Sequence, residues 1–228
     1  VKKLAGSHVL VVGLGGVGAY AAEQLARAGI GTMTIIDSDT VNVTNKNRQL
    51  LALDSTLGRP KVDVMAERIR DINPEINVIP INQYLKDQSI IDLMAQPFDF
   101  IVDAIDTLAP KVFLLYYAVQ NKQKIVSCMG AGGKFNPEMI QITDISKSYN
   151  CRLAFYIRKR LHRLGIREGI TVVFSPEKVA DTAFTIDEEQ TDNKIATVGT
   201  ISYMPAVFGC FCASYVINAL LSSCDQEH

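Results

Sequence analysis

A glycine-rich turn near the N-terminus constrains the fold more than any other feature of this sequence. Gly13, Gly15 and Gly18 form a G-x-G-x-x-G pattern directly after an apolar run at residues 9–12. A helical stretch follows the last glycine, and a second apolar run spans residues 32–36. This order of strand, glycine turn, helix and strand predicts a βαβ unit, with two parallel strands joined by a helix that packs on the sheet.

The alternation of strands and helices continues along the chain. Further strands are predicted at residues 76–81, 98–104 and 124–128, and helices at residues 60–72, 90–94 and 110–121. After Gly133, strands at 139–144 and 171–174 flank a basic helix, and residues 181–193 read as a polar surface loop. The pattern predicts a Rossmann-like, doubly wound, mainly parallel α/β sheet with helices on both faces, extended by C-terminal strands and helices. We expect one domain over residues 1–228.

Residues 195–224 carry no charged side chain, and an uncharged segment of this length could cross a bilayer. Pro205, two glycines and several hydroxyl side chains interrupt the segment, so we expect a buried core helix and no membrane span. The five cysteines are odd in number and fit no disulfide framework, which favours reduced thiols and a cytoplasmic protein. They form no Cys-x-x-Cys pair, so the common zinc pattern is absent. We expect Cys128, Cys210 and Cys212 to be buried and inert, and Cys151 to be the exposed thiol.

The glycine turn also predicts a binding site for phosphate groups. Glycines let the backbone approach phosphates closely, and the start of the following helix offers N–H donors. Asp37 closes the second strand nineteen residues after Gly18, where a carboxylate can accept hydrogen bonds from ribose hydroxyls. These features favour an adenine nucleotide but do not separate NAD from ATP.

Cations after the second strand favour ATP. Arg48 and Lys61 follow Asp37 at a short distance along the chain, and a phosphoanhydride needs such cations where negative charge develops. The alternative function, an NAD-dependent oxidoreductase, would leave both cations without a role. Asp103 and Asp106 end the fourth strand, where a carboxylate can hold Mg²⁺. We favour a metal role for Asp106, whereas Asp103 fits a metal ligand or a helix cap equally well.

Together these residues resemble the ThiF/MoeB/HesA family of adenylating enzymes, the bacterial relatives of ubiquitin-activating enzymes. The motifs that carry the resemblance are, in order, Gly13-x-Gly15-Gly16-x-Gly18, Asp37-x-Asp39-x-Val41, Asn45-x-x-Arg48-Gln49, Gly58-x-x-Lys61 and Asp103-x-x-Asp106. The resemblance implies a nucleotide-binding half over residues 1–133 and a substrate-binding and dimerisation half over residues 134–228.

The resemblance assigns roles to individual residues. Arg48, Lys61 and Asp106 are the implied catalytic residues, with Asp106 as the Mg²⁺ ligand. The implied ATP-binding residues are Gly13, Gly15, Gly16, Gly18, Asp37, Asp39, Asn45, Arg48, Gln49 and Lys61. The family pattern also implies a homodimer, in which an arginine ahead of the first strand reaches the partner's ATP. The sequence opens with Val rather than Met, so we expect it to be trimmed at its front and to lack the segment that carries this arginine.

The second half is similar to the branch of the family that acts on tRNA. The similarity lies in Gly130-Ala131-Gly132-Gly133-Lys134 and in Val172-Val173-Phe174-Ser175. It implies ATP-dependent adenylation of the carboxylate of threonylcarbamoyladenosine in tRNA, followed by cyclisation with loss of AMP. The alternative is adenylation of the C-terminal glycine of a ubiquitin-like sulfur-carrier protein, whose activators usually bind zinc through Cys-x-x-Cys pairs. A third alternative is a nucleotide- or tRNA-binding module without turnover.

A basic helix is consistent with an RNA partner. It carries Arg158, Lys159, Arg160 and Arg163, and aromatic side chains are interleaved with the cations. Cations and aromatic rings together suit RNA phosphates and stacked bases. An ordinary amphipathic surface helix that packs its leucines inward would show the same pattern, and both interpretations can hold at once.

Overall fold

The computed structural model describes residues 2–179, 184–185 and 197–222. The strands are β1 (His8–Val12), β2 (Thr32–Asp37), β3 (Asn77–Asn82), β4 (Phe100–Asp103), β5 (Ile125–Cys128), β6 (Gln141–Asp144), β7 (Thr171–Phe174), β8 (Phe184–Thr185) and β9 (Thr197–Val198). The helices are α1 (Lys2–Ala5), α2 (Gly18–Arg27), α3 (Lys61–Ile72), α4 (Gln88–Met94), α5 (Leu108–Gln120), α6 (Arg152–Arg163) and α7 (Tyr203–Ser222). Short 3₁₀ turns lie at Val43–Asn45, Asp54–Thr56, Pro137–Met139 and Ile145–Lys147.

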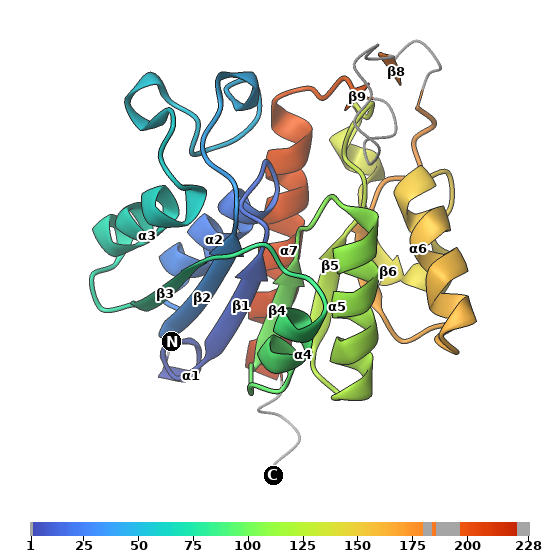
Figure 1. The fold of residues 1–228 in the computed structure, drawn as a ribbon, viewed down its shortest axis with the longest axis horizontal. Coiled ribbons are helices and arrows are strands. Elements are labelled where there is room, and N and C mark those ends of the chain that lie inside the picture. Colours follow the sequence, from blue (N-terminus) through green and yellow to red (C-terminus); the bar gives the residue numbers. More distant parts are fainter. Residues whose placement is uncertain (1, 180–183, 186–196, 223–228) are drawn as a thin grey trace.

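Seven strands form one sheet in the order β3-β2-β1-β4-β5-β7-β6 (Figure 1). All neighbours run parallel except β6, which pairs antiparallel with β7 at the edge. The strand order reverses between β1 and β4, and open α/β sheets bind their ligands at the carboxyl edge beside such a reversal. The predicted doubly wound fold is confirmed, and the fold points to the ends of β1 and β4 as the place for a ligand.

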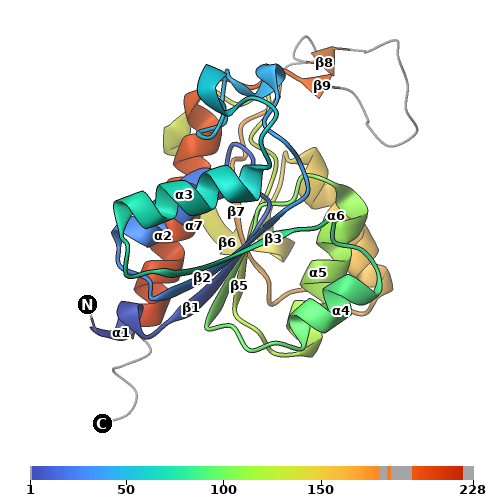
Figure 2. The same cartoon turned by 60° about the vertical axis from the view of Figure 1, so that its left-hand side comes forward.

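Helices cover both faces of the sheet (Figure 2). One apolar core joins α2, α3 and α7 to the sheet, and a second joins α4, α5 and α6 to the opposite face. The central strands read as unbroken apolar runs because both of their faces are buried; the β1 side chains from Val9 to Val12 are at most 3% exposed. Alternate residues of β1 belong to the two cores, as the two-residue period of a strand requires.

The uncharged helix α7 lies in the first of these cores. Among the described residues it is the one helix long and apolar enough to span a membrane. Its Met204, Phe208, Cys212 and Val216 are buried against α2 and the sheet, so this side of α7 is a core face. The backbones of α2 and α7 approach closely at Gly209, where an added Cβ would lie 2.5 Å from the Val17 carbonyl oxygen. The predicted core helix is therefore confirmed over the described residues.

Some local predictions need correction. Cys151 is buried, because it packs into the second core at the start of α6, and Cys210 is exposed on the outer side of α7. Strand β6 begins at Gln141, since Pro137 starts a 3₁₀ turn. The polar segment 181–193 lies outside the described residues except for β8, which pairs with β9.

Candidate functional site

The glycine turn lies at the carboxyl ends of β1 and β4, where only glycine fits at two positions. Gly13 has φ +88°, and an added Cβ there would lie 2.8 Å from the carbonyl oxygen of Ala104, directly after β4. A Cβ on Gly18 would lie 1.7 Å from the carbonyl oxygen of Gly13. The turn therefore folds tightly against β4 and directs its backbone toward the start of α2. The N-cap of α2, Val17, has no side-chain hydrogen bond to the first turn, so the turn's N–H groups suit an anion.

Asp37 holds this turn from the end of β2. Its Oδ2 accepts a hydrogen bond from the backbone N–H of Leu14 at 2.6 Å, and its Oδ1 accepts one from the N–H of Asp39 at 2.8 Å. Charge-assisted bonds of this kind are stronger than neutral ones. Asp37 thus connects the glycine turn to the chain after β2, and each of its oxygens keeps further lone pairs for a ligand hydroxyl.

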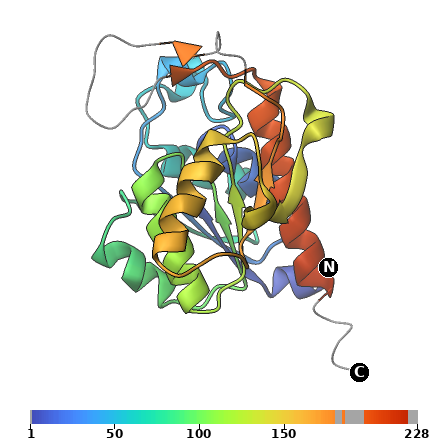
Figure 3. The same ribbon diagram turned by 90° about the vertical axis from the view of Figure 1, so that its right-hand side faces the viewer.

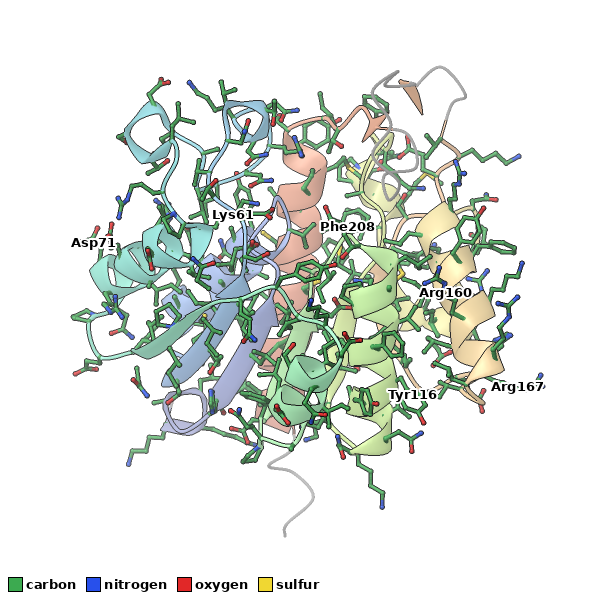
Figure 4. The ribbon with its side chains drawn as sticks, in the orientation of Figure 1. Lys61, Asp71, Tyr116, Arg160, Arg167 and Phe208 are labelled. Carbon is green, nitrogen blue, oxygen red and sulfur yellow. The ribbon has the colours of Figure 1, made fainter. Side chains whose placement is uncertain are left out.

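Lys61 begins α3 and is only 4% exposed. Its ammonium lies 2.8 Å from Oδ2 of Asp39, whose side chain is 67% exposed. The backbones also meet, because the N–H of Lys61 donates to the carbonyl of Asp39. Figure 4 places Lys61 at the end of α3 nearest the carboxyl edge of the sheet, and Asp71 at the far end. A buried lysine needs a counter-charge, and here the counter-charge is exposed.

The segment between β2 and α3 brings the remaining predicted residues toward the glycine turn. The Gln49 Nε2 would lie 3.8 Å from a Cβ on Gly15, and the Arg48 carbonyl 3.3 Å from one on Gly16. Arg48 is half-buried and donates from Nη1 to the Thr44 carbonyl and to Oδ1 of its neighbour in the chain.

Asn45 closes a short capping box in the same segment. Its Oδ1 accepts from the N–H of Asn42, which leaves the amide Nδ2 as the group suited to donate to a phosphate. Asn47 anchors the segment by donating to the Thr200 carbonyl ahead of α7.

The two carboxylates after β4 have different surroundings. Asp103 is fully buried and forms an ion pair with Lys111, so neither of the roles expected from its position, metal ligand or helix cap, holds. Asp106 is exposed, and the N-cap position of α5 is occupied by Thr107. Asp106 is therefore the carboxylate at this strand end that fits Mg²⁺, which usually takes one or two carboxylates with water and phosphate oxygens. Among the described residues, no group of three or more His, Cys, Asp and Glu side chains suits a metal held by protein alone.

The burial of two lysines was not predicted from the sequence. Lys111 lies inside α5 with no exposure, 2.8 Å from Oδ2 of Asp103, and also donates to the Ile105 carbonyl at 3.0 Å. Ser127 of β5 completes the network with a 2.6 Å hydrogen bond to the same carboxylate oxygen. A charged residue in a helix usually faces solvent, so the sequence alone does not indicate that Lys111 is buried. Its burial follows from the packing of α5 against β4 and β5, which brings it to Asp103.

The second of these lysines is Lys134, which is 1% exposed and follows β5. It donates to the carbonyls of Ser175, Glu177 and Asn150. Burial lowers the pKa of the Lys134 ammonium, and the charge of Glu177 partly opposes this. The Glu177 carboxylate in turn accepts from the N–H of Phe135. The segments after β5 and β7 are thereby joined at the carboxyl edge of the sheet.

The basic helix α6 lies beside β6 at one end of the sheet (Figure 3). Lys159, Arg160 and Arg163 are exposed, whereas Arg158 is half-buried and donates to the Ser148 carbonyl at 2.7 Å. Arg158 thus fixes the turn ahead of α6. Its neighbours on the exposed side present their charge to solvent, and Figure 4 shows Arg160 midway along the outer side of the helix.

Two of the thiols, Cys210 and Cys212, are poor nucleophiles. A hydrogen bond with Cys128, together with burial, raises the pKa of Cys212 well above its ordinary value, and burial also raises the pKa of Cys210. Thiolates are the reactive form of cysteine, so these groups stay protonated and inert near neutral pH.

The arrangement at the carboxyl edge can bind a nucleotide, with a glycine cradle, a carboxylate for ribose and two cations for phosphates.

The sequence profile of the ThiF family matches residues 1–228. The chain belongs to the ThiF family. The tRNA threonylcarbamoyladenosine dehydratase of Bacillus subtilis is 37% identical over 227 residues, covering 97% of this chain and 89% of that protein. The molybdopterin-synthase adenylyltransferase of Escherichia coli is 42% identical over 108 residues, which cover only 47% of this chain. The resemblance found in the sequence is therefore confirmed at the level of the family.

A solved structure agrees over the whole chain. The structure of E. coli tRNA N6-threonylcarbamoyladenosine dehydratase in complex with ATP has a TM-score of 0.91 and 35% sequence identity. It covers 100% of this chain, and this chain covers 90% of it. The same E. coli protein in complex with AMP gives a TM-score of 0.89.

Proposed function

We propose that this protein uses ATP to adenylate the carboxylate of threonylcarbamoyladenosine in tRNA and then cyclises the modification with loss of AMP. The observation that carries the proposal is the full-length match to a dehydratase that binds ATP and AMP. The glycine cradle, the buried Lys61 and Arg48, whose backbone lies against the cradle, are the kind of binding groups that such a reaction requires. The molybdopterin-synthase adenylyltransferase, by contrast, matches less than half of this chain.

ATP would lie with its ribose at Asp37 and its phosphates over the glycine turn. Lys61 is held nearby by Asp39, and Arg48 approaches from the segment after β2. The modification's carboxylate attacks the α-phosphorus, the bond to the bridging oxygen breaks, and pyrophosphate leaves. Cations that face the phosphates stabilise the charge that builds on the departing group. Asp106 would hold the Mg²⁺ that neutralises phosphate oxygens.

The second step needs no side-chain nucleophile. The carbamoyl group of the same modification closes on the activated carbonyl, and AMP departs with the carboxylate oxygen. One water is thereby removed from the modification at the cost of ATP cleavage. Because both reacting groups belong to one molecule, little entropy is lost on bringing them together. The raised pKa of the Cys212 thiol agrees with this route.

The proposal assigns residues 1–133 to nucleotide binding and 134–228 to substrate binding and dimerisation. Lys159, Arg160 and Arg163 would contact tRNA phosphates, with Arg158 holding the turn beneath them. The outer side of α7 exposes Tyr203, Cys210 and Leu221 without any charge, which supports a homodimer. The free cysteines among the described residues and the proposed tRNA substrate support a cytoplasmic protein.

Pyrophosphate release from Mg-ATP tests the proposal directly. We expect release with tRNA that carries threonylcarbamoyladenosine and none with the same tRNA unmodified. Arg48→Ala should reduce the rate by at least about tenfold, because removal of one charge-stabilising group usually costs that much or more. Arg70→Ala is the matched control, since Arg70 is equally cationic but lies in the last turn of α3, away from the glycine turn.

The outcomes separate the alternatives. No release with either tRNA, but release with a ubiquitin-like protein, would replace the tRNA substrate by a sulfur carrier. ATP binding without release in either assay would indicate a binding module.

Charge reversal at Lys159, Arg160 and Arg163 should weaken tRNA binding and flatten its salt dependence while leaving the KM for ATP unchanged.

A further inference from the structure

An exposed aromatic ring lies at the carboxyl edge of the sheet, the edge that also holds the glycine turn. Tyr149 precedes α6 and is 52% exposed. Its ring meets the ring of Phe174, the last residue of β7, edge to face with centroids 5.8 Å apart. Phe174 is fully buried, so it forms the base on which Tyr149 rests. The other side of the tyrosine ring faces solvent.

Strand register places this ring near the nucleotide. Asp103 of β4 pairs with Ser127 of β5, and Ser127 pairs with Val172 of β7. Neighbouring strands lie about 4.8 Å apart, so the end of β7 is about 10 Å from the end of β4. A ligand bound at β4 and a second group stacked on Tyr149 can therefore belong to neighbouring nucleotides of one strand.

The turn that carries the ring is held on both sides. Ser148 is buried, and its carbonyl accepts from Arg158. Asn150 adopts φ +52°, donates from Nδ2 to the Pro176 carbonyl and accepts from Lys134 through its own carbonyl. Residues other than glycine rarely adopt this backbone conformation, and the surrounding bonds maintain it. An exposed ring on a fixed turn loses little entropy when it binds a ligand.

The charges beside Tyr149 suit a polyanion. Exposed cations come shortly before and after it in the chain, as Lys147 and Arg152, and Lys178 follows β7 close to the Pro176 contact. The Arg152 guanidinium lies 5.9 Å from the centre of the Tyr156 ring, within cation–π range. A ring with exposed cations close to it in the chain favours a nucleic-acid base over an apolar protein surface.

We propose that the exposed face of Tyr149 stacks on an unpaired base of the RNA substrate, next to the adenosine whose carboxylate is activated. The proposal rests on the proposed function and adds a residue that orients the RNA at that site. Stacking of a base on an aromatic side chain tolerates any base, because every base has a π face. Tyr149 would therefore hold the strand in position, while the pocket for the modification sets specificity.

The test compares tRNA binding and turnover in variants of this one ring. Tyr149→Ala and Tyr149→Leu should each raise the Kd and the KM for modified tRNA about tenfold, because both remove the π face. Leucine still covers Phe174, so it separates stacking from loss of packing. Tyr149→Phe and Tyr149→Trp keep a ring and should bind within about twofold of the parent protein. The KM for ATP should not change in any variant.

Tyr84→Ala is the matched control, because Tyr84 is 54% exposed but follows β3 at the opposite end of the sheet. Unchanged tRNA binding in Tyr149→Ala, with turnover intact, would overturn stacking and leave the proposed function standing. Equal losses in the Phe and Ala variants would also overturn it, since the ring would then not be the active element. A parent protein that binds no tRNA would refute the proposed function itself. A change in oligomeric state without a change in tRNA binding would assign Tyr149 to a contact between copies of the chain.

Discussion

The buried ion pair between Asp103 and Lys111 gives a prediction whose size follows from the structure. Both side chains are 0% exposed, and their charged atoms lie 2.8 Å apart. Removing one partner of a buried pair costs about 3 to 5 kcal/mol, because the other charge stays buried without compensation. After Lys111→Met, the Asp103 carboxylate would still accept from Ser127 Oγ and from the Ile105 N–H. These two bonds place the expected loss of unfolding free energy near the lower end, at about 3 kcal/mol.

A double-mutant cycle tests the origin of that loss. Asp103→Asn alone should cost about as much, since it leaves the Lys111 ammonium buried among carbonyl oxygens. The double variant Asp103→Asn with Lys111→Met removes both charges, so its loss should be at least about 2 kcal/mol smaller than the sum of the single losses. Equilibrium unfolding in urea measures all four proteins.

A surface pair serves as the control for this cycle. Lys46 and Asp54 lie at nearly the same separation, 2.7 Å, but their side chains are 37% and 86% exposed. Exposed pairs contribute about 0 to 1 kcal/mol, so their removal should change stability little. Additive losses at Asp103 and Lys111 within about 0.5 kcal/mol would refute the reasoning, because independent sites add in this way.

Three further changes test other parts of the structure. Gly18→Ala should prevent stable folding, because its Cβ would lie 1.7 Å from a backbone oxygen of the turn, whereas Gly6→Ala, with no atom nearer than 3.7 Å, should melt close to the parent protein. Lys134→Met should lower the unfolding free energy in urea by about 1 to 3 kcal/mol, since buried carbonyls lose their donor. Burial alone would raise the pKa of Glu23, but hydrogen bonds from Arg68 and a second arginine hold it below its ordinary value. That stabilisation is therefore present above the ordinary pKa of about 4.3 and is lost as the pH falls below it; Glu23→Gln should remove this part of the acid transition, which thermal melts between pH 3 and 6 can follow.

The nucleotide end of the sheet could be predicted because its signals are local. A glycine needed for positive φ or for close contact shows in the sequence wherever it stands, and Gly13 and Gly18 meet those conditions. Asp37 was expected to bind ribose, and the structure adds that it also accepts from two backbone N–H groups. The sequence contains the carboxylate but not the contact, since Leu14 lies twenty-three residues away.

The polar interior could not be predicted for the same reason. Lys111 and Lys134 look like surface lysines, because nothing near them in the chain indicates burial. Their partners come from other strands, and only the completed sheet brings Asp103 and Ser175 to them. Cys151 was misplaced on similar grounds, since the path of the chain from β6 into α6 decides which thiol is covered.

In the proposed function, the pair of Lys61 and Asp39 would keep a buried cation ready for ATP. An ammonium with 5% of its side chain exposed would be costly without a counter-charge, and Asp39 supplies one at 2.8 Å. Because Asp39 is itself 67% exposed, water screens the ion pair. Replacing the Asp39 carboxylate by another anion therefore costs little free energy. A phosphate arriving over the glycine turn can therefore take the place of the carboxylate without a new burial cost for the lysine. Asp39→Asn should then lower the unfolding free energy of the free protein more than that of the ATP complex, in which the phosphate provides the counter-charge. An equal loss in both states would mean that Lys61 keeps Asp39 as its partner when ATP binds.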